Sequence, residues 1–278
     1  MATGVAGVGL TYACVHFLSS SPEMALVHPE QVELSGNRNV SRAIVLDIFR
    51  SDRGHSILSI PLAARRRQIE SIPWVEQATV RRALPHTLQV EVVERTPIAF
   101  LRDGSDMALI DVHGVVLDRP LQGRFHFPVV TGFGSGMPVE DREKRMQLFA
   151  GFMHDLESAR AGAVEEVSEV DLSDPHDLRA TLDGLQPGTL SGSASQAGNP
   201  DAWGDSNDPI LVHFGDSDFE SKYETLIDKL RQWRATAGRV ESVDLRFDGQ
   251  AVVNSDTPAI ARVQPDTATQ KHAARHAH

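Results

Sequence analysis

Few residues in this sequence have the types and spacing that covalent chemistry needs. Ser135 lies in a glycine-rich stretch, but in the wrong register for a Gly-x-Ser-x-Gly nucleophile, and the stretch lacks the lysine of a phosphate-binding loop. His113 and Asp111 belong to what reads as a tight turn. Histidines near the C-terminus could bind a metal weakly, but an accidental cluster is the simpler interpretation; they are His272, His276 and His278. The sequence therefore predicts no enzyme, no cofactor, no metal site and no small-molecule substrate.

Composition narrows the remaining function classes. The chain has 278 residues and 41% hydrophobic residues, enough for two domains with sizeable cores. Its net charge of −11 argues against nucleic acid as a partner, because that affinity comes largely from Lys and Arg. The single cysteine, Cys14, excludes structural disulfides and thiolate zinc sites. Residues 30–102 carry 11 basic and 8 acidic residues, whereas the rest of the chain is strongly acidic, so we expect separate modules with separate partners.

What remains is binding through the backbone. The last strand of an antiparallel domain leaves a row of unpaired N–H and C=O groups that can accept a strand from a partner. The segment before it alternates apolar and polar residues up to Phe247, and Asp248-Gly249 is typical of a two-residue hairpin turn. The strand expected after this turn carries no charge and no proline; its residues are Gln250, Ala251, Val252 and Val253.

The N-terminal run predicts a membrane span. Residues 2–18 carry no charge and would reach ~26 Å as a helix, slightly less than a typical ~30 Å hydrocarbon core. The span is assigned to residues 1–19. The alternatives are a buried core helix and a cleaved signal peptide. A signal peptide would carry a basic leader and an A-x-A cleavage site, and both are absent. The side chains expected in the bilayer are Val5, Val8, Leu10, Tyr12, Val15, Phe17 and Leu18.

Two folded modules follow, in an α+β architecture. Residues 28–97 read as strand, helix, helix, strand, strand, with the returning strand alternating cleanly from Thr87 to Val92. Residues 98–257 read as a second, mixed α/β domain with a mainly antiparallel sheet, interrupted by a Gly- and Ser-rich insertion at 186–209. Residues 258–278 read as a disordered tail. The apolar stripe of one helix is expected to pack on its own sheet; it comprises Phe219, Tyr223, Leu226, Leu230 and Trp233.

Ordered motifs carry a resemblance to a known family. Ile72-Pro73-Trp74-Val75, Leu84-Pro85-x-Thr87-Leu88 and Val93-Glu94-Arg95-x-Pro97 follow a Gly36-Asn37 turn, and Val243-Asp244-Leu245-Arg246 precedes an aromatic residue near the end. This pattern resembles the bacterial cell division family FtsQ, called DivIB in Gram-positive species. The resemblance implies a membrane helix, a POTRA domain and a second domain typical of the family.

The resemblance also implies a function. A protein of this family would be a divisome scaffold in the cell inner (plasma) membrane, single-pass, with its C-terminal domains extracytoplasmic and enriched at the division septum. It would recruit the partners FtsB and FtsL, and other divisome components would be partners of the POTRA domain. The family's docking role falls on Tyr223, Phe247, Gln250, Ala251, Val252 and Val253. The family often has a further aromatic residue where Asn254 and Ser255 stand here. The alternatives are a POTRA chaperone for outer-membrane assembly or secretion, and an extracytoplasmic hydrolase of cell-wall material.

Overall fold

The computed structural model describes residues 22–120, 123–185, 208–247 and 250–255. The predicted membrane residues, the predicted tail and nearly all of the predicted insertion lie outside these ranges, as does the predicted turn at Asp248-Gly249. No helix within the described ranges is long and apolar enough to cross a membrane. Short 3₁₀ turns occur at Pro22–Met24, Pro29–Gln31, Arg50–Asp52 and Ala163–Glu166.

The first unit is a three-stranded sheet covered by two helices. Its strands lie in the order β1-β3-β2, with β1 parallel to β3 and β2 antiparallel to it. The elements follow one another as β1 (Val32–Ser35), α2 (Arg42–Ile48), α3 (Leu62–Glu70), β2 (Val75–Ala83) and β3 (Thr87–Glu94). This is the predicted strand-helix-helix-strand-strand order.

Local sequence explains these elements. Leu88, Val90 and Val92 of β3 are buried and alternate with exposed residues, as a half-buried strand requires. The hydroxyl of Ser41 accepts a hydrogen bond from the backbone N–H of Ala43 and caps α2. Gly36 has a φ of 82°, and a Cβ there would lie 2.0 Å from the carbonyl oxygen of Val92, so only glycine fits this turn.

The second unit is built on a nine-stranded mixed sheet with the order β12-β11-β10-β9-β8-β7-β4-β5-β6. Most neighbouring strands are antiparallel, but β4 with β7, β7 with β8, and β10 with β11 are parallel. The strands are β4 (Pro97–Asp103), β5 (Asp106–Asp111), β6 (Val116–Leu117), β7 (Val129–Thr131), β8 (Val167–Asp174), β9 (Asp177–Leu182), β10 (Ile210–Gly215), β11 (Val240–Asp244) and β12 (Val252–Ser255).

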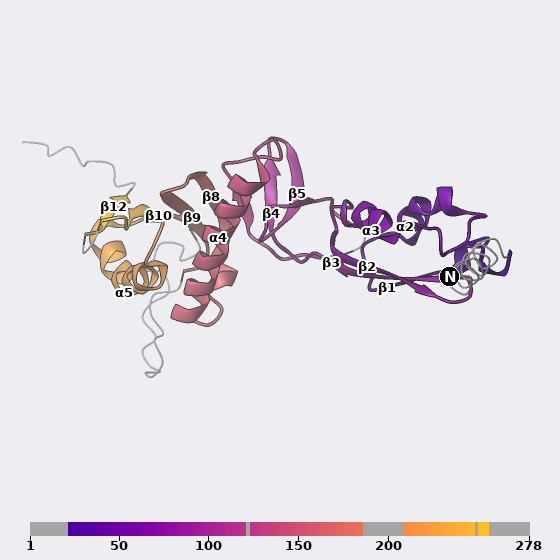
Figure 1. Ribbon diagram of the computed structural model, residues 1–278. Helices are drawn as coiled ribbons and strands as arrows, with labels where there is room; N and C mark the ends of the chain where they lie inside the picture. The colour runs from indigo at the N-terminus through magenta and orange to yellow at the C-terminus, as the bar shows by residue number, and fades with distance from the viewer. Residues whose placement is uncertain (1–21, 121–122, 186–207, 248–249, 256–278) are drawn as a thin grey trace, which may run out of the picture.

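Two long helices, α4 (Val139–Ala159) and α5 (Phe219–Ala237), share one core with this sheet (Figure 1). The predicted stripe of α5 is buried at Phe219, Tyr223, Leu226 and Leu230, so it packs on its own domain as expected. Phe152 of α4 contacts Phe214 and Phe219 edge to face, with ring centres 5.0 and 5.3 Å away.

The two units also share buried contacts at the β6 end of the large sheet. Leu109 and Leu117 are fully buried in the core of the first unit. The indole N–H of Trp74 donates to the carbonyl oxygen of Asp118 at 3.0 Å. Arg95 donates to Asp111 at 2.9 Å, and Asp111 is only 2% exposed. The first unit therefore covers this edge of the sheet.

Candidate functional site: an open sheet edge

The opposite edge of the nine-stranded sheet is formed by β12. Its inner side pairs antiparallel with β11, with Asp244 opposite Val252 and Val243 opposite Val253. No strand within the described ranges pairs with its outer side. Val252 is 50% exposed. An exposed edge strand of this kind presents free backbone donors and acceptors to a partner.

The paired part of β11 and β12 is shorter than predicted. β11 ends at Asp244 and β12 begins at Val252, and these two residues form the last pair of the ladder. The described residues between the strands are Leu245, Arg246, Phe247, Gln250 and Ala251, and we call these five residues the loop. Gln250 and Ala251, predicted as edge-strand residues, are therefore not part of β12, while the predicted turn at Asp248-Gly249 lies outside the described residues.

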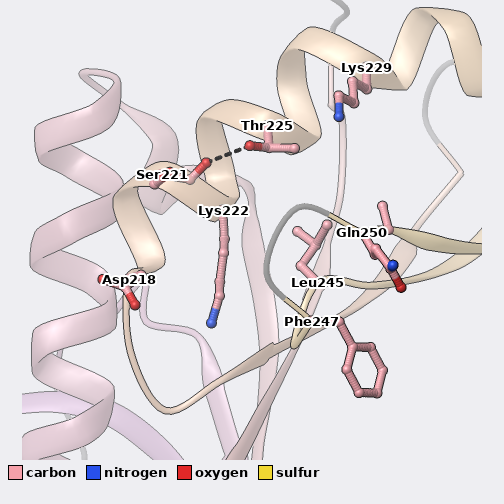
Figure 2. A pocket seen from close by; sticks show the side chains of 9 residues that line it. Asp218, Ser221, Lys222, Thr225, Lys229, Leu245, Phe247 and Gln250 are labelled. Atoms are coloured by element: carbon pink, nitrogen blue, oxygen red, sulfur yellow. Dashed lines mark hydrogen bonds between the residues drawn. The ribbon is translucent and has the colours of Figure 1, made fainter.

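This loop and helix α5 enclose a hollow of 280 Å³ (Figure 2). Figure 2 shows the ring of Phe247 directed away from helix α5, and the side chain of Lys222 extending from α5 toward the connection between β10 and α5. Phe247 is 56% exposed, a large fraction for an aromatic side chain. The lining residues are Asp218, Ser221, Lys222, Thr225, Lys229, Leu245, Phe247, Gln250 and Ala251.

The two lysines that line the hollow differ in whether their ammonium groups bind other described residues. The ammonium group of Lys222 donates to the carbonyl oxygens of Phe214 and Ser217, both at 2.8 Å, so it fixes the start of α5. Lys229 forms no ion pair with any residue that the structure describes and is exposed. Of the two lysines that line the hollow, Lys229 is therefore the one without an ion pair among the described residues.

Arg246 anchors the start of the loop. Its guanidinium donates to Asp244 at 2.6 Å and approaches Asp177 of β9 at 3.4 Å, and it lies 5.8 Å from the ring centre of Phe247. The hydrogen bonds from Arg246 are the main cause that lowers the pKa of Asp244. His213 of β10 adds a 2.8 Å contact to Asp177. Asp244 of β11 and Asp177 of β9 thus hold Arg246, and His213 of β10 in turn contacts Asp177.

The predicted docking residues separate into two groups. Phe247 and Val252 are exposed at the edge, Gln250 and Ala251 line the hollow, and Val253 on β12 is half-buried against the core. Tyr223 does not belong to this surface, because it is only 1% exposed and its hydroxyl donates to Glu166 at 2.7 Å. Burial is the main cause that raises the pKa of Tyr223, and the hydrogen bond to Glu166 adds to it.

Sequence reasoning missed Asp177 and His213, which support Arg246. They come from different strands, 36 residues apart, and only the pairing of β9 with β10 brings them together. No local motif could have revealed this contact.

The described residues also contain no group of three or more His, Cys, Asp or Glu side chains placed to hold a metal.

Comparison with known proteins decides the family. Residues 27–95 match the FtsQ-type POTRA domain. Residues 99–246, more than half of the chain, match the C-terminal region of cell division protein FtsQ/DivIB. The chain belongs to the FtsQ/DivIB family. FtsQ is a non-enzymatic protein of the divisome, which agrees with the prediction that the chain is not an enzyme.

Individual FtsQ relatives support this assignment. The cell division protein FtsQ of Koribacter versatilis is 33% identical over 236 residues, which cover 84% of this chain and 62% of the relative. FtsQ of Novosphingobium aromaticivorans is 36% identical over 40% of this chain and 35% of its own length. FtsQ of Syntrophotalea carbinolica is 25% identical over 82% of this chain and 73% of its own length. The chain thus spans less than two thirds of the first two relatives, and all three are cell division proteins.

Proposed function

We propose that this protein is a membrane-anchored divisome scaffold that recruits FtsB and FtsL through the outer edge of β12. The observation that carries the proposal is the open edge, with Val252 and Phe247 exposed beside it. A partner strand added here would extend the nine-stranded sheet through main-chain hydrogen bonds.

Side chains around the edge would supply specificity. Aromatic residues are the usual energetic anchors of protein interfaces, and Phe247 is exposed although Arg246 holds the loop in place. Because Asp244 and Asp177 already hold Arg246, this residue loses little conformational entropy on binding. The hollow between α5 and the loop would accept a side chain of the partner, and Lys229 favours an acidic group at its rim.

Membrane anchoring completes the proposal. Residues 1–19 would span the cell inner membrane once and place both folded domains outside the cytoplasm, at the septum. Confinement to the membrane raises the effective concentration of partners, so contacts of modest strength suffice for assembly.

The proposal is tested by capturing the cognate FtsB–FtsL pair with the full chain in detergent. Phe247→Glu and Val252→Glu would each place a charge in the interface, and we expect each to weaken binding by about 2 kcal/mol, roughly thirtyfold in Kd. Leu211→Glu is the matched control, because Leu211 is an exposed aliphatic residue of the same sheet that lies on β10, away from the edge.

Equal binding by the parent chain and both edge variants would reject the docking edge while leaving the family assignment intact. Equal loss in the Leu211→Glu control would show that the effect is not specific to the edge, and would reject it as well.

A further inference from the structure

The POTRA domain ends, on the side away from the second domain, in a tip built from three segments. The tip comprises residues 22–28, 53–60 and 81–86. Leu26 exchanges backbone hydrogen bonds with Gly54 and His55 at 2.8 and 2.9 Å, which joins the first segment to the second. The guanidinium of Arg82 donates to the carbonyl oxygens of Ile57 and Ile60, which joins the second segment to the third. The described chain begins in this region (Figure 1).

Each segment of the tip exposes an aliphatic side chain. Val27 is 53% exposed, Leu58 is 39% exposed, and Leu84, at the turn between β2 and β3, is 66% exposed. Solvent-facing turns usually carry polar residues, and Leu84 has the largest exposed fraction among the large hydrophobic residues of the described ranges. Three exposed aliphatic residues in adjoining segments indicate a contact surface.

The charge of the tip is opposite to that of the whole chain. Its three segments contain Arg53, Arg81 and Arg82 but a single acidic residue, Glu23, whereas the chain carries a net charge of −11. Arg53 and Arg81 are exposed and form no ion pair with any other described residue. A cationic surface with aliphatic side chains fits an anionic phospholipid headgroup layer, where arginine meets phosphate and aliphatic groups reach the acyl boundary.

The position of the tip in the chain points to the same occupant. If residues 1–19 span the membrane, as proposed above, only residues 20 and 21 separate the span from Pro22. Three residue steps of extended chain cover at most ~10 Å, and the headgroup region itself is roughly 5–8 Å thick on each side of the bilayer. The tip is therefore tethered within reach of the headgroups.

We propose that the tip of the POTRA domain lies in the headgroup layer of the membrane, with Leu58 and Leu84 at the acyl boundary and Arg53 and Arg81 on anionic phosphates. This inference rests on the proposed membrane anchor. The contact would fix the orientation of the POTRA domain relative to the membrane, so that the second domain extends away from the lipid surface.

Site-specific fluorescence tests the contact in the full chain. Cys14→Ser removes the single cysteine, and Leu84→Cys then carries an environment-sensitive fluorophore in vesicles of phosphatidylcholine with phosphatidylglycerol. Val139→Cys is the control, because Val139 is 45% exposed and lies at the start of α4 in the second domain. We expect lipid-borne doxyl quenchers to reduce the signal at position 84 about twofold more than at position 139.

A second set of variants tests whether the contact depends on the anionic lipid. Arg53→Gln with Arg81→Gln should abolish most of this difference in phosphatidylglycerol vesicles, and Arg231→Gln on α5 should preserve it. A label at position 84 that only aqueous iodide quenches would overturn the proposal, and so would a label shielded from both quenchers, which would mean that protein covers the tip. Resistance of the chain to carbonate extraction is measured in parallel, because its loss would instead reject the membrane anchor.

Discussion

The two edges of the nine-stranded sheet are treated in opposite ways. At the β6 edge, Leu117 is fully buried in the core of the POTRA domain and Trp74 bonds the backbone just beyond the strand. At the β12 edge, Val252 and Phe247 are half exposed and the outer backbone has no partner among the described strands. Exposed edges invite unwanted pairing, so proteins usually cover or charge them. Among the described residues, the contrast between a covered edge and an unpaired one is what the proposed docking of a partner strand on β12 requires.

The largest effect is expected from a substitution that removes a buried contact between the POTRA domain and the β6 edge. Trp74→Ala deletes a buried aromatic side chain and its hydrogen bond to Asp118, and we expect it to lower the free energy of unfolding by about 3–5 kcal/mol. Denaturant unfolding of the chain in detergent, followed by circular dichroism, measures the loss.

Phe247→Ala is the matched change at the open edge. Because Phe247 is 56% exposed, its removal should change the free energy of unfolding by less than about 0.5 kcal/mol. Similar stability losses in the two variants would contradict the distinction between a structural and a functional edge.

A smaller effect is expected at Glu94, where β3 leads toward the covered edge. Burial is the largest single influence on the pKa of Glu94 and raises it, but hydrogen bonds from the backbone N–H groups of Val40, Arg38 and Asn39 together outweigh it, so the pKa is lowered. Glu94→Gln should cost about 1 kcal/mol of stability, because it weakens the acceptor that holds the segment before α2.

The pH dependence of the Glu94 contribution follows from the lowered pKa. The stabilisation is present above the ordinary value of 4.5 and is lost as the pH falls through the lower folded value. The parent chain should therefore lose its advantage over Glu94→Gln in acid. An advantage that persists unchanged in strong acid would show that the carboxylate charge is not responsible.

Much of this fold was predictable because its signals are local and periodic. The alternation in β3 and the three- and four-residue steps in α5 predicted buried faces that the structure confirms. The end of the β11–β12 pairing at Asp244 and Val252 was not predictable, because apolar and polar residues alternate in the sequence as far as Phe247 and no local signal marks where the pairing stops. Two predictions for Tyr223 conflicted: the helical periodicity placed it in the buried stripe of α5, whereas the family resemblance placed it among the docking residues. The structure agrees with the periodicity, because Tyr223 is buried.

The smallest predicted effect concerns His113, in the turn between β5 and β6 at the covered edge. Its Nδ1 lies 3.0 Å from Glu143 of α4, and this hydrogen bond is the main cause that raises the pKa of His113. Glu143→Gln should return that pKa toward its ordinary value of 6.5, which an NMR titration of the ring measures directly. Glu140→Gln, an exposed acidic residue one turn earlier on the same helix, is the control and should leave the titration unchanged.

The stability effect of this pair has a definite sign. A raised folded pKa means that the stabilisation is present below the ordinary value of 6.5 and disappears as the pH rises through the folded value. Since His113 and Glu143 are both more than a third exposed, solvent screens the pair and the difference should be only a few tenths of a kcal/mol, roughly 0.3. A larger loss, or one that grows at high pH, would mean that the turn depends on Glu143 through packing and not through charge. The β6 edge is held mainly by buried contacts such as that of Trp74, so a small effect here and a large one there are the expected pair of results.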